Sequence, residues 1–163
     1  MPEQVAINSP EFARNGESLR GRVTVGSMDR LRDLLLSGEG ELEYILAGRR
    51  GENGKLYLDC AISGQLQLTC QRCLDALVYP LDVESELELA EGEQSQDGEE
   101  LTDAIEADPA LDVLALIEDE VLLALPMAPM HSPDECKAKA NASQAKLEKK
   151  NAFSALAALK TKD

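Results

Sequence analysis

Residues 56–70 read LYLDCAISGQLQLTC and carry the clearest periodic pattern in this chain of 163 residues. Apolar side chains occupy the even positions and mostly polar side chains the odd ones, so the pattern predicts a long strand with one buried face. Such a strand would span about 50 Å, which is too long to stay flat across a domain of this size. Gly64 interrupts the apolar series, and we therefore expect a bulge or a sharp bend there that lets the sheet curl.

Upstream of this segment the sequence also favours an antiparallel sheet. Residues 19–25 can form a strand, and residues 42–46 alternate between apolar and polar side chains. Residues 48–54 contain several glycines and an Asn-Gly pair, which predicts a hairpin turn. Between the first two strands, Ser27 can cap a helix that we expect over residues 28–36.

Downstream of the quoted segment, strand and helix signals follow one another. Residues 77–89 alternate again, and Pro80 within them predicts an edge strand or a local irregularity because proline has no N–H to donate. Residues 90–108 are acidic and lack periodicity, which predicts a mobile acidic loop. Asp112 is then expected to cap a long helix that ends at Leu125, before a proline.

These segments together predict an α+β fold with a curled, mostly antiparallel sheet, for which barrel-like closure is one option. One early helix, one long late helix and a loosely attached C-terminal tail complete it. We expect residues 1–136 to form a single domain that includes the acidic loop. Residues 137–163 are expected to form a lysine-rich linker and a short docking segment with Phe153, Leu156 and Leu159.

The net charge of −15 is distributed unevenly along the chain. Residues 1–80 contain nine basic and eleven acidic side chains, whereas residues 81–136 contain eighteen acidic side chains and no Lys or Arg. Residues 137–163 contain seven lysines and two acidic residues. The middle segment would repel a polyanion, so any direct contact with nucleic acid belongs to the two flanks. The alternative interpretation of these charges is a solvated surface that maintains solubility.

The candidate nucleic-acid contacts are therefore Arg49, Arg50 and Arg72, together with the lysines of the tail. Aromatic residues make up only 3% of the chain and tryptophan is absent, which argues against a groove that stacks single-stranded bases. The chain has no run of 18 apolar residues, so we expect no membrane partner. Its amino terminus lacks the apolar core of a secretory signal, and we therefore expect a cytoplasmic protein.

The cysteines are candidate metal ligands, because a reducing cytoplasm disfavours disulfides. Cys70 and Cys73 form a C-x-x-C pair between two strands, whereas a redox pair would be expected to begin a helix. If the segment after the late helix returns to this turn, His131 and Cys136 complete a structural zinc site. The alternative is that Cys70 completes the buried face of its strand and Cys73 is an ordinary turn residue. Cys60 is expected to be a core thiol.

Motifs of common enzyme classes are missing from the chain. It has one histidine and no nucleophile elbow, P-loop, dinucleotide-binding glycine motif or zinc-protease motif. The adjacent Glu118, Asp119 and Glu120 could be imagined as acid-base catalysts, but on an amphipathic helix we interpret them as its solvent-facing side. We therefore expect no catalytic residue and a protein that is not an enzyme.

Four segments together resemble the bacterial YceD family of large ribosomal RNA subunit accumulation proteins. They are LTCQRC at residues 68–73, the helix at 112–125, PMAPMH at 126–131 and NAFSALAALK at 151–160. The resemblance implies a cytoplasmic protein that promotes accumulation of large-subunit ribosomal RNA, without a known reaction. Some relatives have further cysteines after the helix, where this chain has a histidine and a cysteine.

Two functions follow from the sequence and the resemblance. The first is a non-enzymatic factor for the accumulation or maturation of large-subunit (23S) ribosomal RNA, which would contact ribosomal RNA or a ribosome-associated protein. The second is an acidic chaperone or adaptor whose residues 82–108 bind a basic ribosomal protein or a nuclease. A metal- or thiol-dependent enzyme is a third alternative, which only the cysteine pair supports. The sequence leaves the oligomeric state open.

Overall fold

The computed structural model describes residues 5–90 and 103–137. Of the tail predicted over residues 137–163, all but Lys137 therefore lies outside the described residues, and the proposed division of the chain stays a prediction. The elements in chain order are β1 (Ala6–Ile7), α1 (Ser9–Asn15), β2 (Ser18–Thr24), the 3-10 turn η1 (Val25–Ser27), α2 (Asp29–Arg32), β3 (Glu41–Arg50), β4 (Leu56–Thr69), β5 (Ala76–Ala90), β6 (Asp103–Glu106), β7 (Leu111–Asp112) and α3 (Val113–Ala124).

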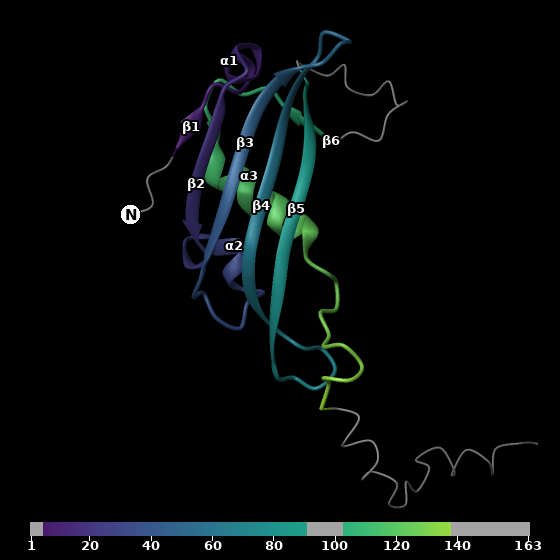
Figure 1. The fold of residues 1–163 in the computed structure, drawn as a ribbon. Coiled ribbons are helices and arrows are strands. Elements are labelled where there is room, and N and C mark those ends of the chain that lie inside the picture. Colours follow the sequence, from purple (N-terminus) through teal and green to yellow (C-terminus); the bar gives the residue numbers. More distant parts are fainter. Residues whose placement is uncertain (1–4, 91–102, 138–163) are drawn as a thin grey trace, which may run out of the picture.

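The main feature is a five-stranded sheet in the order β2-β3-β4-β5-β6. Its pairings are antiparallel except for the last, in which β5 and β6 run parallel. Figure 1 shows a twisted sheet with α3 crossing one face, which we call the inner face, while α1 lies at one end. The predicted α+β class is thereby confirmed. The sheet does not close into a barrel, because β2 and β6 remain at its two edges.

The strand β4 pairs along its whole length with β5 and from Leu56 to Gly64 with β3. Both registers continue without an extra residue, so of the bulge or sharp bend predicted at Gly64, the bulge is wrong. The glycine instead allows close packing, because a Cβ at this position would lie 2.5 Å from Cδ2 of Leu42. The long strands accommodate their length by twisting (Figure 1).

Within the part of the chain that the structure describes, β5 is an edge strand over most of its length, as Pro80 predicts. Only its last residues, from Leu87 to Ala90, pair with β6. Of the acidic loop predicted over residues 90–108, residues 91–102 lie outside the described residues, whereas Asp103–Glu106 forms β6. The prediction of a loop is wrong for that part, where the partly buried Ile105 packs against the core.

The helix α3 has the predicted cap and the buried side that its amphipathic pattern predicts. The side chain of Asp112 accepts hydrogen bonds from the backbone N–H groups of Leu114 and Ala115 at 2.9 and 3.2 Å. Val113, Ile117 and Val121 repeat every four residues and are buried against the inner face. Among the described residues, no helix is sufficiently long and apolar to cross a membrane.

The helix α2 is much shorter than the helix predicted over residues 28–36. The Ser27 hydroxyl does not cap it but donates a hydrogen bond to the carbonyl of Thr24 at 2.7 Å. The chain leaves the helix because the N–H of Leu36 donates to the carbonyl of Gln67 at 2.8 Å. Gln67 lies in the part of β4 that extends past its pairing with β3. This pairing with β4 replaces the last helical turns.

The helix α1 was missed, although its end signals are present in the sequence. The Asn8 side chain accepts a hydrogen bond from the N–H of Glu11 at 3.1 Å, and Gly16 ends the helix with a φ of 65°. Phe12 and Ala13 are buried, and they pack so closely on Gly48 that a Cβ there would lie 2.6 Å from backbone atoms of both. The helix thus covers one end of the sheet.

Candidate metal centre

The four predicted metal ligands lie together at the end of the sheet opposite α1 (Figure 1). Cys70 and Cys73 belong to the turn between β4 and β5, whereas His131 and Cys136 belong to the segment that follows α3. Two chain segments that are far apart in the sequence therefore form one cluster.

Backbone hydrogen bonds hold each half of the cluster in place. In the turn, the N–H of Leu74 donates to the carbonyl of Cys70 at 2.9 Å, which is the bond of a tight turn. In the second segment, the N–H of Cys136 donates to the carbonyl of Ser132 at 3.1 Å. The two halves are joined by the N–H of Gln71, which donates to the carbonyl of Pro129 at 2.8 Å.

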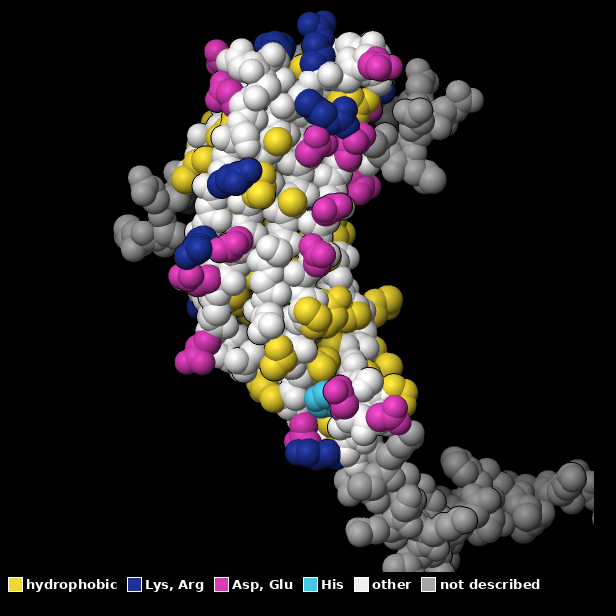
Figure 2. Space-filling model, viewed as in Figure 1, with side chains coloured by type: hydrophobic (Ala, Val, Ile, Leu, Met, Phe, Trp, Pro, Cys, Tyr) yellow, Lys and Arg dark blue, Asp and Glu magenta, His cyan; other side chains and the backbone are white. Residues whose placement is uncertain are grey.

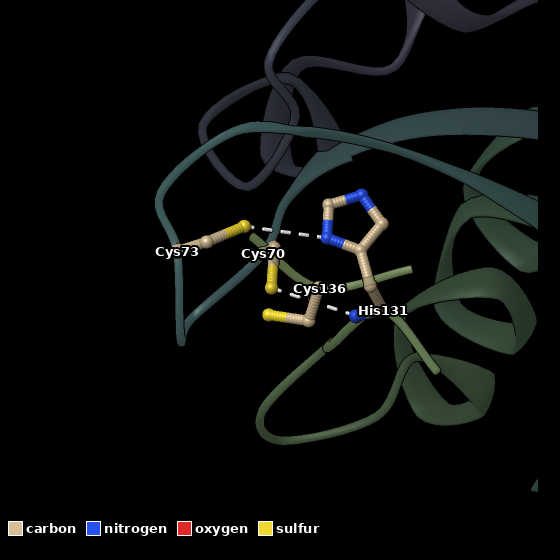
Figure 3. A group of neighbouring side chains, drawn as sticks. All are labelled: Cys70, Cys73, His131 and Cys136. Atoms are coloured by element: carbon tan, nitrogen blue, oxygen red, sulfur yellow. Dashed lines mark hydrogen bonds between the residues drawn. The ribbon is translucent and has the colours of Figure 1, made fainter. Parts of the chain in front are cut away.

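The ligand atoms lie close to the spacing that a tetrahedral metal ion requires. The three sulfur atoms and one ring nitrogen all lie within 4.8 Å of one another. Ligand atoms around a tetrahedral zinc ion, with bonds of about 2.0–2.3 Å, lie about 3.4–3.8 Å apart. Figure 3 shows the side chains pointing toward one another, with Sγ of Cys73 at 3.3 Å from Nδ1 of His131. A small contraction or expansion would bring all four atoms to zinc-binding distance.

The imidazole of His131 is oriented as in many metal sites. Its Nε2 lies 2.9 Å from the carbonyl oxygen of Ala76, so Nε2 carries the proton and Nδ1 presents its lone pair to the cysteines. A backbone carbonyl that fixes the tautomer of a ligating histidine is a common outer contact of metal centres. The donor set and its outer contact therefore fit Zn²⁺.

Hydrogen bonds favour the thiolate form of Cys70. Burial raises its pKa, but backbone N–H groups of Cys73, His131 and Arg72 outweigh burial, so the pKa is lowered to about 5. One of these bonds, from the N–H of His131 to Sγ, is 3.4 Å long. For Cys73, a backbone hydrogen bond at Asp75 lowers the pKa, but burial and the neighbouring thiols raise it overall. A divalent cation among the sulfur atoms would favour the thiolate of each.

The cluster is largely enclosed by protein. Cys70 and Cys136 are buried, and Cys73 and His131 are half-buried. Four protein ligands saturate a tetrahedral ion, so the arrangement suits a structural metal centre rather than one that binds substrate. Cys60 lies apart from it as the predicted core thiol, and burial raises its pKa to about 12.

The three arginines predicted to contact RNA do not form one surface. Arg49 and Arg50 end β3, whereas Arg72 lies in the turn at the opposite end of β4, about 43 Å away at 3.3 Å per residue. Arg49 forms ion pairs with Asp59, at 2.8 Å, and with Glu86, and its guanidinium stacks 4.5 Å above the ring centre of Tyr57. Arg50 and Arg72 are exposed.

The acidic group on α3 differs from its predicted solvent-facing role. Glu118 and Glu120 are buried. Glu118 Oε1 accepts hydrogen bonds from the backbone N–H groups of Arg30 and Leu31 at 2.8 and 3.0 Å, and Oε2 accepts one from the Arg30 guanidinium at 3.0 Å. Burial raises the pKa of Glu118, but these donors lower it overall. The carboxylate thus anchors α2 to α3, and no signal near it in the sequence indicates its partners.

Comparisons with known proteins agree with the resemblance seen in the sequence. The family described as Large ribosomal RNA subunit accumulation protein YceD matches residues 58–160, which include all four clustered ligands. A protein of Haemophilus influenzae with this same name is 32% identical over 118 residues, which cover 67% of this chain. The chain spans 64% of the length of that relative. No solved structure matches the chain.

Proposed function

Since the chain belongs to the YceD family, we propose that it is a non-enzymatic factor of ribosome biogenesis that promotes accumulation or maturation of large-subunit (23S) ribosomal RNA in the cytoplasm. The observation that carries this proposal is the family match, which extends from β4 through α3 and the metal centre into the tail. The name of the Haemophilus influenzae relative supports the same class of function.

The proposed structural zinc ion would be held by Cys70, Cys73, His131 and Cys136. Bound there, zinc would contribute folding free energy at the end of the sheet, because four protein ligands leave no open position for a substrate. This donor set supports a binding role rather than a catalytic one. The role of the chain's own residues is then to fix the turn after β4 and the segment after α3 relative to each other.

The proposed RNA contacts are Arg50 and Arg72, together with lysines of the tail. Both arginines are exposed, and among the described residues the Arg72 guanidinium has only a sulfur contact, with Sδ of Met130 at 3.6 Å. Arg49, in contrast, has its guanidinium occupied by two carboxylates, and we assign it a structural role. Contacts at two ends of a long sheet would suit a ligand that extends along the protein rather than a small one.

Ultraviolet cross-linking in cells, followed by sequencing of the bound RNA, tests the proposal. We expect adducts to large-subunit ribosomal RNA that decrease in Arg50→Ala/Arg72→Ala and persist in the matched control Arg22→Ala, which removes an exposed arginine that pairs with Glu43 at 2.7 Å. If the double variant loses phosphate contacts, its plot of log RNA affinity against log salt concentration should be less steep by about 0.7–0.9 per lost contact. Adducts confined to a basic protein would instead favour the adaptor function.

A further inference from the structure

The strand β5 carries a row of acidic side chains on the face opposite α3. Asp82, Glu84, Glu86 and Glu88 occupy alternate positions there, and Figure 2 shows acidic groups gathered along this strand. Glu86 pairs with Arg49, and Glu88 pairs with Lys55 at 2.8 Å. Asp82 and Glu84 are exposed and form no ion pair with any residue that the structure describes. Neither carboxylate therefore has a cationic partner at ion-pair distance among residues 5–90 and 103–137.

The backbone edge beside these two carboxylates is also open. The strand β6 pairs only with residues 87–90 of β5, so the preceding residues of β5 have no neighbouring strand on that side among the described residues. An exposed strand edge offers N–H and C=O groups to any extended segment that lies along it. A basic extended segment would fit both the edge and its charge.

The lysine-rich tail begins next to the start of this edge. Lys137 directly follows the metal centre, and its ammonium group lies 3.2 Å from a carboxylate oxygen of Asp75, one residue before β5. Beyond it, residues 138–163 contain six lysines and only two acidic residues. The tail is thus anchored by an ion pair at the point where the acidic edge strand begins.

The tail is long enough to reach these two carboxylates. Asp82 and Glu84 lie seven and nine residues beyond Asp75, or about 23 and 30 Å along the strand. Lys146 follows Lys137 by nine residues, so a fully extended chain allows at most about 32 Å between them. Three residues later come two further lysines, at 149 and 150, with a correspondingly longer reach.

We propose that residues 138–150 of the same chain lie along the open edge of β5, where Lys146, Lys149 and Lys150 pair with Asp82 and Glu84. Each pair is exposed and individually weak. The tether at Lys137 makes the association intramolecular, and short tethers give effective concentrations of about millimolar. The contact should weaken strongly with salt, because the screening length falls from about 8 Å at physiological salt to about 3 Å at 1 M.

One consequence rests on the proposed function. Lysines that pair with β5 are not available to phosphate groups, so docking of the tail would compete with RNA binding. The docking itself concerns the free protein, and its test therefore needs no RNA. A failure of docking and a failure of RNA binding are distinguishable.

Zero-length carbodiimide cross-linking of the purified full-length protein tests the docking, because it joins only lysines and carboxylates that are in contact. A mixture of ¹⁵N-labelled and unlabelled protein separates bonds within a chain from bonds between chains. We expect cross-links within one chain from Lys146, Lys149 or Lys150 to the peptide with Asp82 and Glu84, and we expect their yield to fall strongly in 1 M salt.

Backbone amide NMR shifts supply a second readout that does not depend on the cross-linker. Amides of residues 82–85 should change in Lys146→Gln/Lys149→Gln/Lys150→Gln, and wild-type shifts in 1 M salt should approach those of this variant. Amides of the tail should change in Asp82→Asn/Glu84→Gln and stay unchanged in the matched control Glu11→Gln/Glu52→Gln, which neutralises two exposed carboxylates near the other end of the sheet. Cross-links only to carboxylates of residues 91–102, cross-links only between chains, or amide shifts independent of the lysines would each overturn the proposal.

Discussion

The contact between Glu118 and the start of α2 gives a graded prediction for three substitutions. Glu118→Ala removes the acceptor of the N–H groups of Arg30 and Leu31, and the latter bond is buried. Glu118→Gln keeps Oε1, which accepts both of these bonds. It removes the negative charge and replaces Oε2, the acceptor of the Arg30 guanidinium, with an amide NH₂ group. The matched control Asp119→Ala removes an ion pair to the same arginine in which both side chains are about half exposed.

The expected losses of stability differ because a buried N–H group that loses its acceptor cannot form a hydrogen bond with water instead. An unsatisfied buried N–H costs about 1–3 kcal/mol, so we expect Glu118→Ala to lower the free energy of unfolding by about 2–4 kcal/mol. In urea this corresponds to a midpoint about 1–2 M lower, at an m-value typical of a domain of this size. Glu118→Gln should lose clearly less than this, and Asp119→Ala should remain close to the wild type because its ion pair is exposed.

The pH dependence checks the same contact independently. The folded state lowers the pKa of Glu118 from its ordinary value of 4.5, so the carboxylate stabilises the fold above pH 4.5 and loses this effect as pH falls through the folded pKa. The difference in unfolding free energy between the wild type and Glu118→Gln should therefore shrink below that pH. Equal urea midpoints for Glu118→Ala and Asp119→Ala at neutral pH would refute the reasoning.

Three further predictions concern the metal centre and the backbone. The purified protein should contain about one zinc ion per chain by elemental analysis, Cys136→Ser should lose it, and Cys60→Ala should retain it. Gly48→Ala should lower the free energy of unfolding by about 1–3 kcal/mol, because the new Cβ would lie 2.6 Å from the backbone of α1. Leu74→Gly should raise the thermal midpoint, since Leu74 has a φ of 64° and an exposed side chain that packs on little.

The periodic parts of the fold were predictable because each rests on neighbouring residues. Alternation along 56–70 and 77–89 indicated β4 and β5, and Asp112 indicated the start of α3, because a strand face and a helix cap are local features. The same holds for Pro80, whose missing N–H indicated an edge strand. The ends of α1 carry equally local signals in Asn8 and Gly16, so this helix was also predictable from neighbouring residues.

The other errors in the fold share a physical cause, which is a partner far away in the sequence. The helix predicted over residues 28–36 ends early because Leu36 bonds to Gln67, and Gly64 makes room for Leu42 instead of forming a bulge. The burial of Glu118 depends on backbone N–H groups 87 and 88 residues away. A local pattern indicates that a glycine or a carboxylate is unusual, but it does not indicate what lies opposite.

The candidate site shows the same division between local and distant information. The C-x-x-C turn was a local signal, whereas its grouping with His131 and Cys136 depended on the return of the segment after α3, and the structure places all four ligands within 4.8 Å of one another. The arginines were grouped by charge alone, and this grouping says nothing about position along a sheet. In the structure, Arg49 lies among carboxylates at one end of the sheet, and Arg72 lies at the other end.

The metal centre and the tail are coupled by the order of the chain. Cys136 is a predicted ligand, and the next residue, Lys137, pairs with Asp75 at the beginning of the acidic edge strand. A metal ion that fixes Cys136 would thus also fix the point from which the tail leaves the domain. Since the effective concentration of a tethered group depends on where its tether begins, metal binding at this end would favour docking of the lysines on β5 without contacting them. A structural ion of this kind would affect the availability of the lysines through geometry alone.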